Sequence, residues 1–108
     1  MTDAKAMPKI GDIVKASNTL TRCRHWNVEN HRWEKYWKPH PVITPIPCGM
    51  YLGSVTLFDG HTIWEGEEVG NVFTQSRHFP AVVIQPLDSG GRYRKPEYVL
   101  AEDVEAQP

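Results

Sequence analysis

The chain has 108 residues, of which 40% are hydrophobic and 23% are charged, and this composition excludes a disordered polypeptide. Eight Gly and nine Pro exclude a helical bundle and favour short strands joined by tight turns. No run of 18 apolar residues exists that could span a membrane as a helix, and the net charge of −1 lacks the strong positive field typical of nucleic-acid-binding domains.

One domain is expected between two polar ends. A chain of this length buries a thin core, so residues 10–105 are predicted to fold as a single β-barrel domain. Residues 1–9 and 106–108 are predicted to be flexible, and residues 1–9 lack the apolar core of a signal peptide. Without a secretion signal, Cys23 and Cys48 are expected to be reduced thiols in the cytoplasm.

Turn and strand signals alternate along the whole domain, and no stretch of ten residues has a convincing helical pattern. In chain order they predict strands over residues 13–16, 20–28, 31–37, 50–58, 61–65, 81–85, 92–95 and 98–100. The four prolines between residues 38 and 47 predict an extended crossover or edge segment, because proline cannot donate a hydrogen bond to a strand ladder.

Residues 27–30 are predicted to be the turn of an aromatic hairpin. The hairpin would face Trp26 toward Trp33 as a cross-strand pair. A helix is the alternative, because positions 26, 33 and 37 also share one helical face. The hairpin is preferred because Asn and Val, which fill most of the turn, are poor helix formers.

A second hairpin is predicted at Asp59–Gly60, because an Asp-Gly pair between alternating apolar residues favours a two-residue turn. Residues 66–78 are then expected to be a Gly-rich acidic loop, with Val72 and Phe73 inserted into the core. Near the end, residues 88–91 are predicted to turn the chain, and residues 101–103 to form a one-turn kink before Val104.

The short strands, two of them with tight turns, indicate an all-β small barrel. The opening Gly11–Lys15 strand and the ending Tyr98–Glu105, a strand, a 3₁₀ turn and a strand, resemble an SH3-like barrel, with the aromatic hairpin inserted between its first two strands. The segment Gly49–Glu65, with its Gly-x-x-x-Gly-x-x-Thr-x-x-x-Gly pattern, is similar to small proteins encoded by phages and prophages. This resemblance implies a mobile-element origin in a bacterial host cell and assigns no catalytic residue.

Cations and rings are concentrated between residues 22 and 38, where Trp, Tyr, Arg and Lys form the composition of a binding face. The predicted contact residues are Arg32, Trp33, Lys35, Tyr36 and Trp37, drawn from a segment that also holds Arg22, Arg24, Trp26 and Lys38. The alternative is that these rings belong to the core. The acidic residues Glu65, Glu67 and Glu68 form a second candidate face, although a solvated loop explains them as well.

No chemistry other than binding is expected of this chain. The spacing of Cys23, His25, His31, His40 and Cys48 matches no standard zinc site, so neither a metal nor a cofactor is predicted. Cys23 and His25 could share a strand face, but no oxyanion site or nucleophile motif accompanies them, so no enzyme is predicted. We expect stoichiometric binding to a larger protein or nucleoprotein of the host, such as a defence complex blocked in the way anti-CRISPR proteins act. A nucleic-acid-binding module and a virion structural protein are the alternatives.

Overall fold

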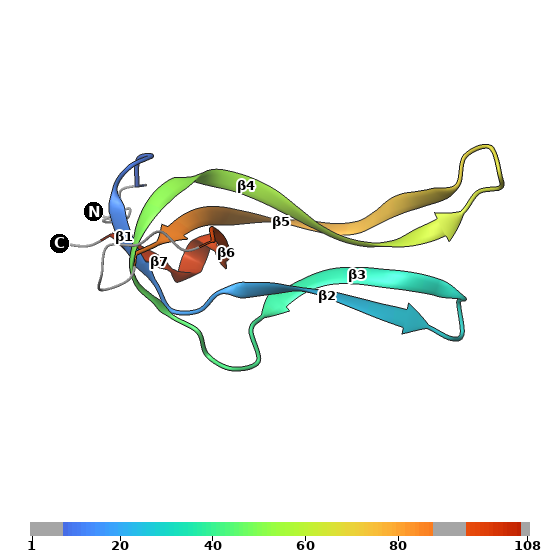
Figure 1. The fold of residues 1–108 in the computed structure, drawn as a ribbon, viewed down its shortest axis with the longest axis horizontal. Helices are drawn as coiled ribbons and strands as arrows, with labels where there is room; N and C mark the ends of the chain where they lie inside the picture. The colour runs from blue at the N-terminus through green and yellow to red at the C-terminus, as the bar shows by residue number, and fades with distance from the viewer. Residues whose placement is uncertain (1–7, 88–94, 107–108) are drawn as a thin grey trace, which may run out of the picture.

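The fold is all-β and antiparallel in the computed structural model, which describes residues 8–87 and 95–106. Within these ranges, the three residues of η1 are the only helical ones. In chain order the elements are β1 (Ile13–Ala16), β2 (Leu20–Asn27), β3 (Arg32–Pro39), β4 (Ile46–Trp64), β5 (Asn71–Pro86), β6 (Glu97–Leu100), η1 (Ala101–Asp103) and β7 (Val104–Ala106) (Figure 1). No described helix is long and apolar enough to cross a membrane.

The long strand β4 organises the sheet because both of its edges are paired. Along one edge it pairs first with β1, where Val14 lies opposite Gly49, and further on with β3, where Glu34 lies opposite His61. Its other edge pairs with β5 over most of its length. β7 continues the sheet beyond β1, β2 continues it beyond β3, and β6 continues it beyond β5.

The sheet is not closed into a barrel, so the prediction of a closed SH3-like barrel is wrong on this point. Closure requires the edge strands to meet with matching tilt and register. β2 comes close to β6 at its start but forms no ladder with it among the described residues. Instead of closing a barrel, β2 and β3 extend away from the other strands, alongside the far ends of β4 and β5.

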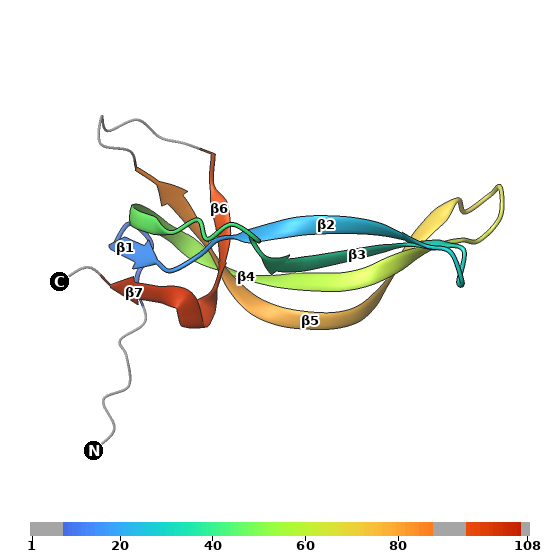
Figure 2. The same cartoon turned by 90° about the horizontal axis from the view of Figure 1, so that it is seen from below.

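The molecule has a base and an arm, and both hairpins of the arm project in the same direction (Figures 1 and 2). We define the arm as β2, β3, residues 58–64 of β4 and residues 71–78 of β5; the base comprises the other described elements. The radius of gyration of the Cα atoms is 17.1 Å, whereas a compact chain of 100 residues has about 13 Å. The projecting arm accounts for this elongation.

Two apolar clusters hold the base and the root of the arm. The first contains Val14, Ala16, Ile46, Tyr51, Val82, Ile84, Val99 and Val104. The second contains Leu20, Leu57 and Ala81, with Trp37, Val55, Phe79, Tyr98 and Leu100 packed against it. Beyond Leu20 at its root, the arm contributes none of the buried hydrophobic side chains of the described residues. The stability of the arm therefore rests on its ladders and its surface pairs.

The aromatic hairpin is confirmed, and the helical alternative is wrong. β2 and β3 pair in regular register from Leu20 opposite Pro39 to Asn27 opposite Arg32. The Oδ1 atom of Asn27 accepts a hydrogen bond of 3.0 Å from the backbone N–H of Asn30 in the turn. Asn27 therefore stabilises the turn through its side chain, which is the physical reason that Asn is favoured there.

The predicted turn at Asp59–Gly60 is wrong, because β4 continues through both residues, with only a shift in its register against β5 between them. The chain reverses over residues 65–70 instead, where Gly66 and Gly70 have φ values of 109° and 77°. The backbone N–H of Glu65 donates to the carbonyl oxygen of Gly70 at 2.9 Å and closes the turn. The predicted loop over residues 66–78 is thus mostly strand β5, and Phe73 is 42% exposed rather than inserted in the core.

Other predictions hold within the described residues. The strand predicted over 81–85 is the last part of β5, where Ala81, Val82 and Ile84 are buried. The predicted kink over 101–103 is η1, and β7 follows it. The turn predicted at 88–91 and most of the strand predicted at 92–95 lie outside the described residues, as do residues 1–7 and 107–108 of the predicted flexible ends.

Candidate functional site

One face of the arm collects cations and aromatic rings from three strands. Directly opposed residues of antiparallel strands project from the same side of a sheet. The outer row across the four strands is therefore Trp26, Trp33, Thr62 and Phe73, and the next row is Arg24, Lys35, Gly60 and Gln75. Arg22, opposite Trp37, follows toward the base. We name Arg22, Arg24, Trp26, Trp33, Lys35 and Phe73 the cation–aromatic face.

Ring contacts give this face a fixed shape. The Cζ atom of Arg24 lies 4.1 Å from the centre of the Trp33 ring, within the range of a cation–π contact. Trp26 meets Trp33 edge to face, with ring centroids 5.3 Å apart. Trp26, Trp33 and Phe73 nevertheless remain 41%, 37% and 42% exposed. Trp26 and Trp33 are thus held against each other, and Trp33 against Arg24, while all three rings present apolar surface to solvent.

A shallow hollow of about 300 Å³ opens beside these residues, toward the base. Arg22 and Lys35 supply its cations, and Trp37, Phe58 and Phe73 supply its rings. Because β2, β3, β4 and β5 all contribute to its lining, the hollow exists only when the two hairpins of the arm lie side by side. Its volume is at the lower end of the range for small-molecule sites.

Acidic residues are kept away from the cation–aromatic face. Only two lie within the strands of the arm, Glu34 and Asp59. Glu34 projects from the opposite side, where its carboxylate accepts a hydrogen bond of 3.0 Å from Arg32 that lowers its pKa. Asp59 is buried and paired with Arg77. Arg22, Arg24 and Lys35 therefore have no acidic residue beside them on this side of the strands, and the other acidic residues of the arm, such as Glu29 and Glu65, lie in or beside its turns.

The structure divides the five contact residues predicted on β3 between the two sides of the sheet. Trp33, Lys35 and Trp37 share one side because residues two apart on a strand point the same way. Arg32, bonded to Glu34, and Tyr36 lie on the other side. On β2, the same two-residue alternation of side chains would have identified Arg22, Arg24 and Trp26 from the sequence as further residues of this face. Phe73 carried no such signal, because its strand was predicted to be a loop.

Trp37 belongs to the core rather than to the exposed surface. It is half-buried, it packs against the second apolar cluster, and its ring centroid lies 4.9 Å from that of Tyr98. It closes the inner end of the hollow as part of the root of the arm. Trp37 therefore packs against the core, as the alternative predicted, whereas Trp33 is exposed and its role as a contact residue stays a prediction.

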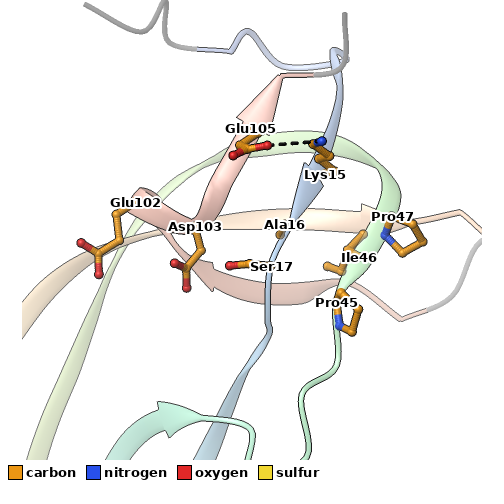
Figure 3. A pocket seen from close by; sticks show the side chains of 9 residues that line it. All are labelled: Lys15, Ala16, Ser17, Pro45, Ile46, Pro47, Glu102, Asp103 and Glu105. Carbon is orange, nitrogen blue, oxygen red and sulfur yellow. Dashed lines mark ion pairs between the residues drawn. The ribbon is translucent and has the colours of Figure 1, made fainter.

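The second predicted face consists of the acidic residues Glu65, Glu67 and Glu68. All three are exposed in or beside the turn between β4 and β5, at the far end of the arm. A further group of carboxylates lies in the base, where Glu102, Asp103 and Glu105 border a hollow of about 360 Å³ (Figure 3). There, Glu105 forms an ion pair of 3.3 Å with Lys15.

The cysteines and histidines do not gather into a metal site in the part of the chain that the structure describes. No group of three or more His, Cys, Asp or Glu residues there has an arrangement that could hold an ion. Cys23 lies on β2 and Cys48 on β4, and both are free thiols. No protein-family model, curated protein or solved structure matches this chain.

Proposed function

We propose that this protein is a non-enzymatic binding module and that the cation–aromatic face is its contact surface. The observation that carries this proposal is the exposure of Trp26, Trp33 and Phe73 on an arm that projects beyond the core. Trp and Arg are the residues that most often dominate the energy of binding interfaces. An exposed cluster of large rings is also uncommon on a monomer unless it contacts a partner.

We infer that the base follows an SH3-like path which stays open. Its strands would be β1, β4, β5, β6 and β7, with η1 before the last strand and the β2–β3 hairpin inserted after the first. In support, β1 pairs with both β4 and β7, while β5 pairs with both β4 and β6. In this interpretation the inserted hairpin supplies most of the contact surface, and the base holds it in place.

The partner that we propose is a larger protein or nucleoprotein of a bacterial host, which the protein binds stoichiometrically as a phage-type accessory protein. The Gly-x-x-x-Gly-x-x-Thr-x-x-x-Gly pattern of Gly49–Glu65, which motivates the phage-type proposal, lies on the long strand β4 that extends into the arm. Inhibition of a host defence complex, as anti-CRISPR proteins achieve it, is the outcome we expect of such binding.

Affinity capture from a bacterial lysate tests this function with a matched pair of variants. Trp33→Ala removes a ring from the cation–aromatic face, whereas Tyr36→Ala removes a ring from the opposite side of the same strand. We expect the wild type and Tyr36→Ala to retain a stoichiometric partner and Trp33→Ala to lose it, with similar melting temperatures for both variants. Equal retention by both variants would contradict the assignment of the contact surface.

A further inference from the structure

We propose that the cation–aromatic face binds single-stranded nucleic acid, with phosphates held by Arg22, Arg24 and Lys35 and bases stacked on Trp33 and Phe73. This inference rests on the proposed function, because it names the chemistry of the partner that the same face contacts.

The charge of the face favours a polyanion. Arg22 and Arg24 are exposed on the edge strand β2, and Lys35 lies opposite Arg24 on β3. None of the three forms an ion pair in the described residues, in contrast to Arg32 and Arg77. Their charge is therefore available to replace the counterions of phosphates. An acidic protein surface would satisfy the cations as well, but it would leave the neighbouring rings without planar partners.

The rings favour a single strand over a duplex. Exposed aromatic side chains stack on the faces of unpaired bases, whereas a duplex hides those faces within its own stack. Trp33 and Phe73 lie in one row, separated by Thr62 on the strand between them, and the hollow beside them contains the Phe58 ring. Stacking of this kind tolerates any base, so the expected recognition is largely independent of sequence.

The spacing of the cations indicates how the nucleic acid would lie on the sheet. Arg22 and Arg24 are two residues apart on β2, which separates their Cα atoms by about 6.8 Å along the edge of the sheet. Phosphates bound there would follow β2, and their bases would turn inward across β3 toward the hollow. The cation–π contact joins the two parts, because it places the guanidinium of Arg24 over one face of the Trp33 ring, so that a base would stack on the face that Arg24 leaves open.

Fluorescence anisotropy with labelled oligothymidylate and oligouridylate tests this proposal on the full chain. We expect both strands to bind. With three phosphate contacts, the logarithm of the association constant should fall with the logarithm of salt concentration with a slope of about −2, or about 20-fold between 50 and 200 mM. An unlabelled duplex should compete poorly.

Variants of residues on β3 test the predicted contacts, and one of them is the control. Lys35→Glu should weaken binding by about tenfold and flatten the salt slope by about one, and Lys35→Gln should do so less. Lys38→Glu changes the same charge on the opposite side of β3 and should bind nearly as the wild type does. Trp33→Ala should weaken binding by about tenfold. Melting curves verify that each variant is folded.

Two results would overturn the nucleic-acid assignment: no binding at low salt, or equal losses in Lys35→Glu and Lys38→Glu. Effective competition by the duplex would overturn the preference for a single strand, because a duplex hides the base faces on which the rings would stack. If the oligonucleotides fail while Trp33→Ala still loses a protein partner captured from lysate, the contact surface stands and only its ligand is wrong. If Trp33→Ala affects neither assay, the proposed function fails as well.

Discussion

The carboxylate of Asp59 accepts a hydrogen bond from the backbone N–H of Trp37 at 2.8 Å, although the two residues are 22 apart in sequence. The β3–β4 ladder ends at Lys35 opposite Gly60, so the N–H of Trp37 has no partner on the backbone of β4. Arg77 binds the other carboxylate oxygen through Nε at 2.9 Å and Nη2 at 2.7 Å. Asp59 thus joins three strands where the arm leaves the base.

Replacement of Asp59 tests this junction. Asp59→Ala removes the acceptor and leaves the N–H of Trp37 partly buried without a partner, which costs about 1–3 kcal/mol in the free energy of unfolding. Asp59→Asn keeps an acceptor and should cost about 1 kcal/mol or less, because Arg77 is largely exposed. Urea denaturation measures both. Equal stability of Asp59→Ala and the wild type would show that the hydrogen bond is replaceable by water.

Gly60 is required by packing rather than by backbone conformation. A Cβ atom placed there would collide with the carbonyl oxygen of Thr74 and would lie 2.7 Å from the Phe73 ring. We expect Gly60→Ala to lower the free energy of unfolding by about 1–3 kcal/mol, and Gly60→Asn to lower it at least as much.

Gly70 is the matched control for Gly60, because it has a φ of 77° and open space around it. At that position Asn should be tolerated better than Ala, since Asn adopts the left-handed conformation more readily. Thermal melting of the four variants compares the two sites. Rescue of residue 60 by Asn would indicate a turn there and contradict the continuous strand.

Trp37 and Trp33 should respond differently to truncation. Trp37→Ala leaves a gap beside Tyr98 and the second apolar cluster, and should cost about 3 kcal/mol in the free energy of unfolding. Trp33→Ala removes only surface contacts with Trp26 and Arg24 and should cost about 1 kcal/mol. Chemical denaturation measures both. Similar large losses would place Trp33 in the core and remove the basis of the contact surface.

The Arg32–Glu34 pair can be followed by pH titration. The hydrogen bond from Arg32 is the main cause that lowers the pKa of Glu34 below its usual value of 4.5. Arg32→Ala should therefore raise that pKa, as measured by NMR titration of the Glu34 side chain. Because the pKa of Glu34 is lower in the folded state, its ionised carboxylate stabilises that state at a pH above the ordinary pKa. This contribution is lost as the pH falls through the pKa of the folded state. An unchanged pKa in Arg32→Ala would mean that the pair does not persist in solution.

Local chemistry in the sequence determined several elements of this protein. The aromatic hairpin follows from Asn at its turn and from Trp26 facing Trp33, and the 3₁₀ turn before β7 follows from a short break between two strand signals. The all-β class follows from the frequency of Gly, Pro and strand-forming residues. In each of these cases the deciding interactions connect residues near one another in the chain.

Only the tertiary structure decided the path of β4 and the composition of the cation–aromatic face. Asp59 and Gly60 have the chemistry of a turn, but pairing with β3 on one edge and β5 on the other outweighs a local preference. Asp59 instead binds Trp37 and Arg77, and Gly60 leaves room for Phe73. All three partners are 13 or more positions away in the sequence. Alternation within a strand identifies which residues share a side, but the neighbouring strand is chosen by long-range pairing. For this reason Phe73 joins Trp33 only in the folded sheet.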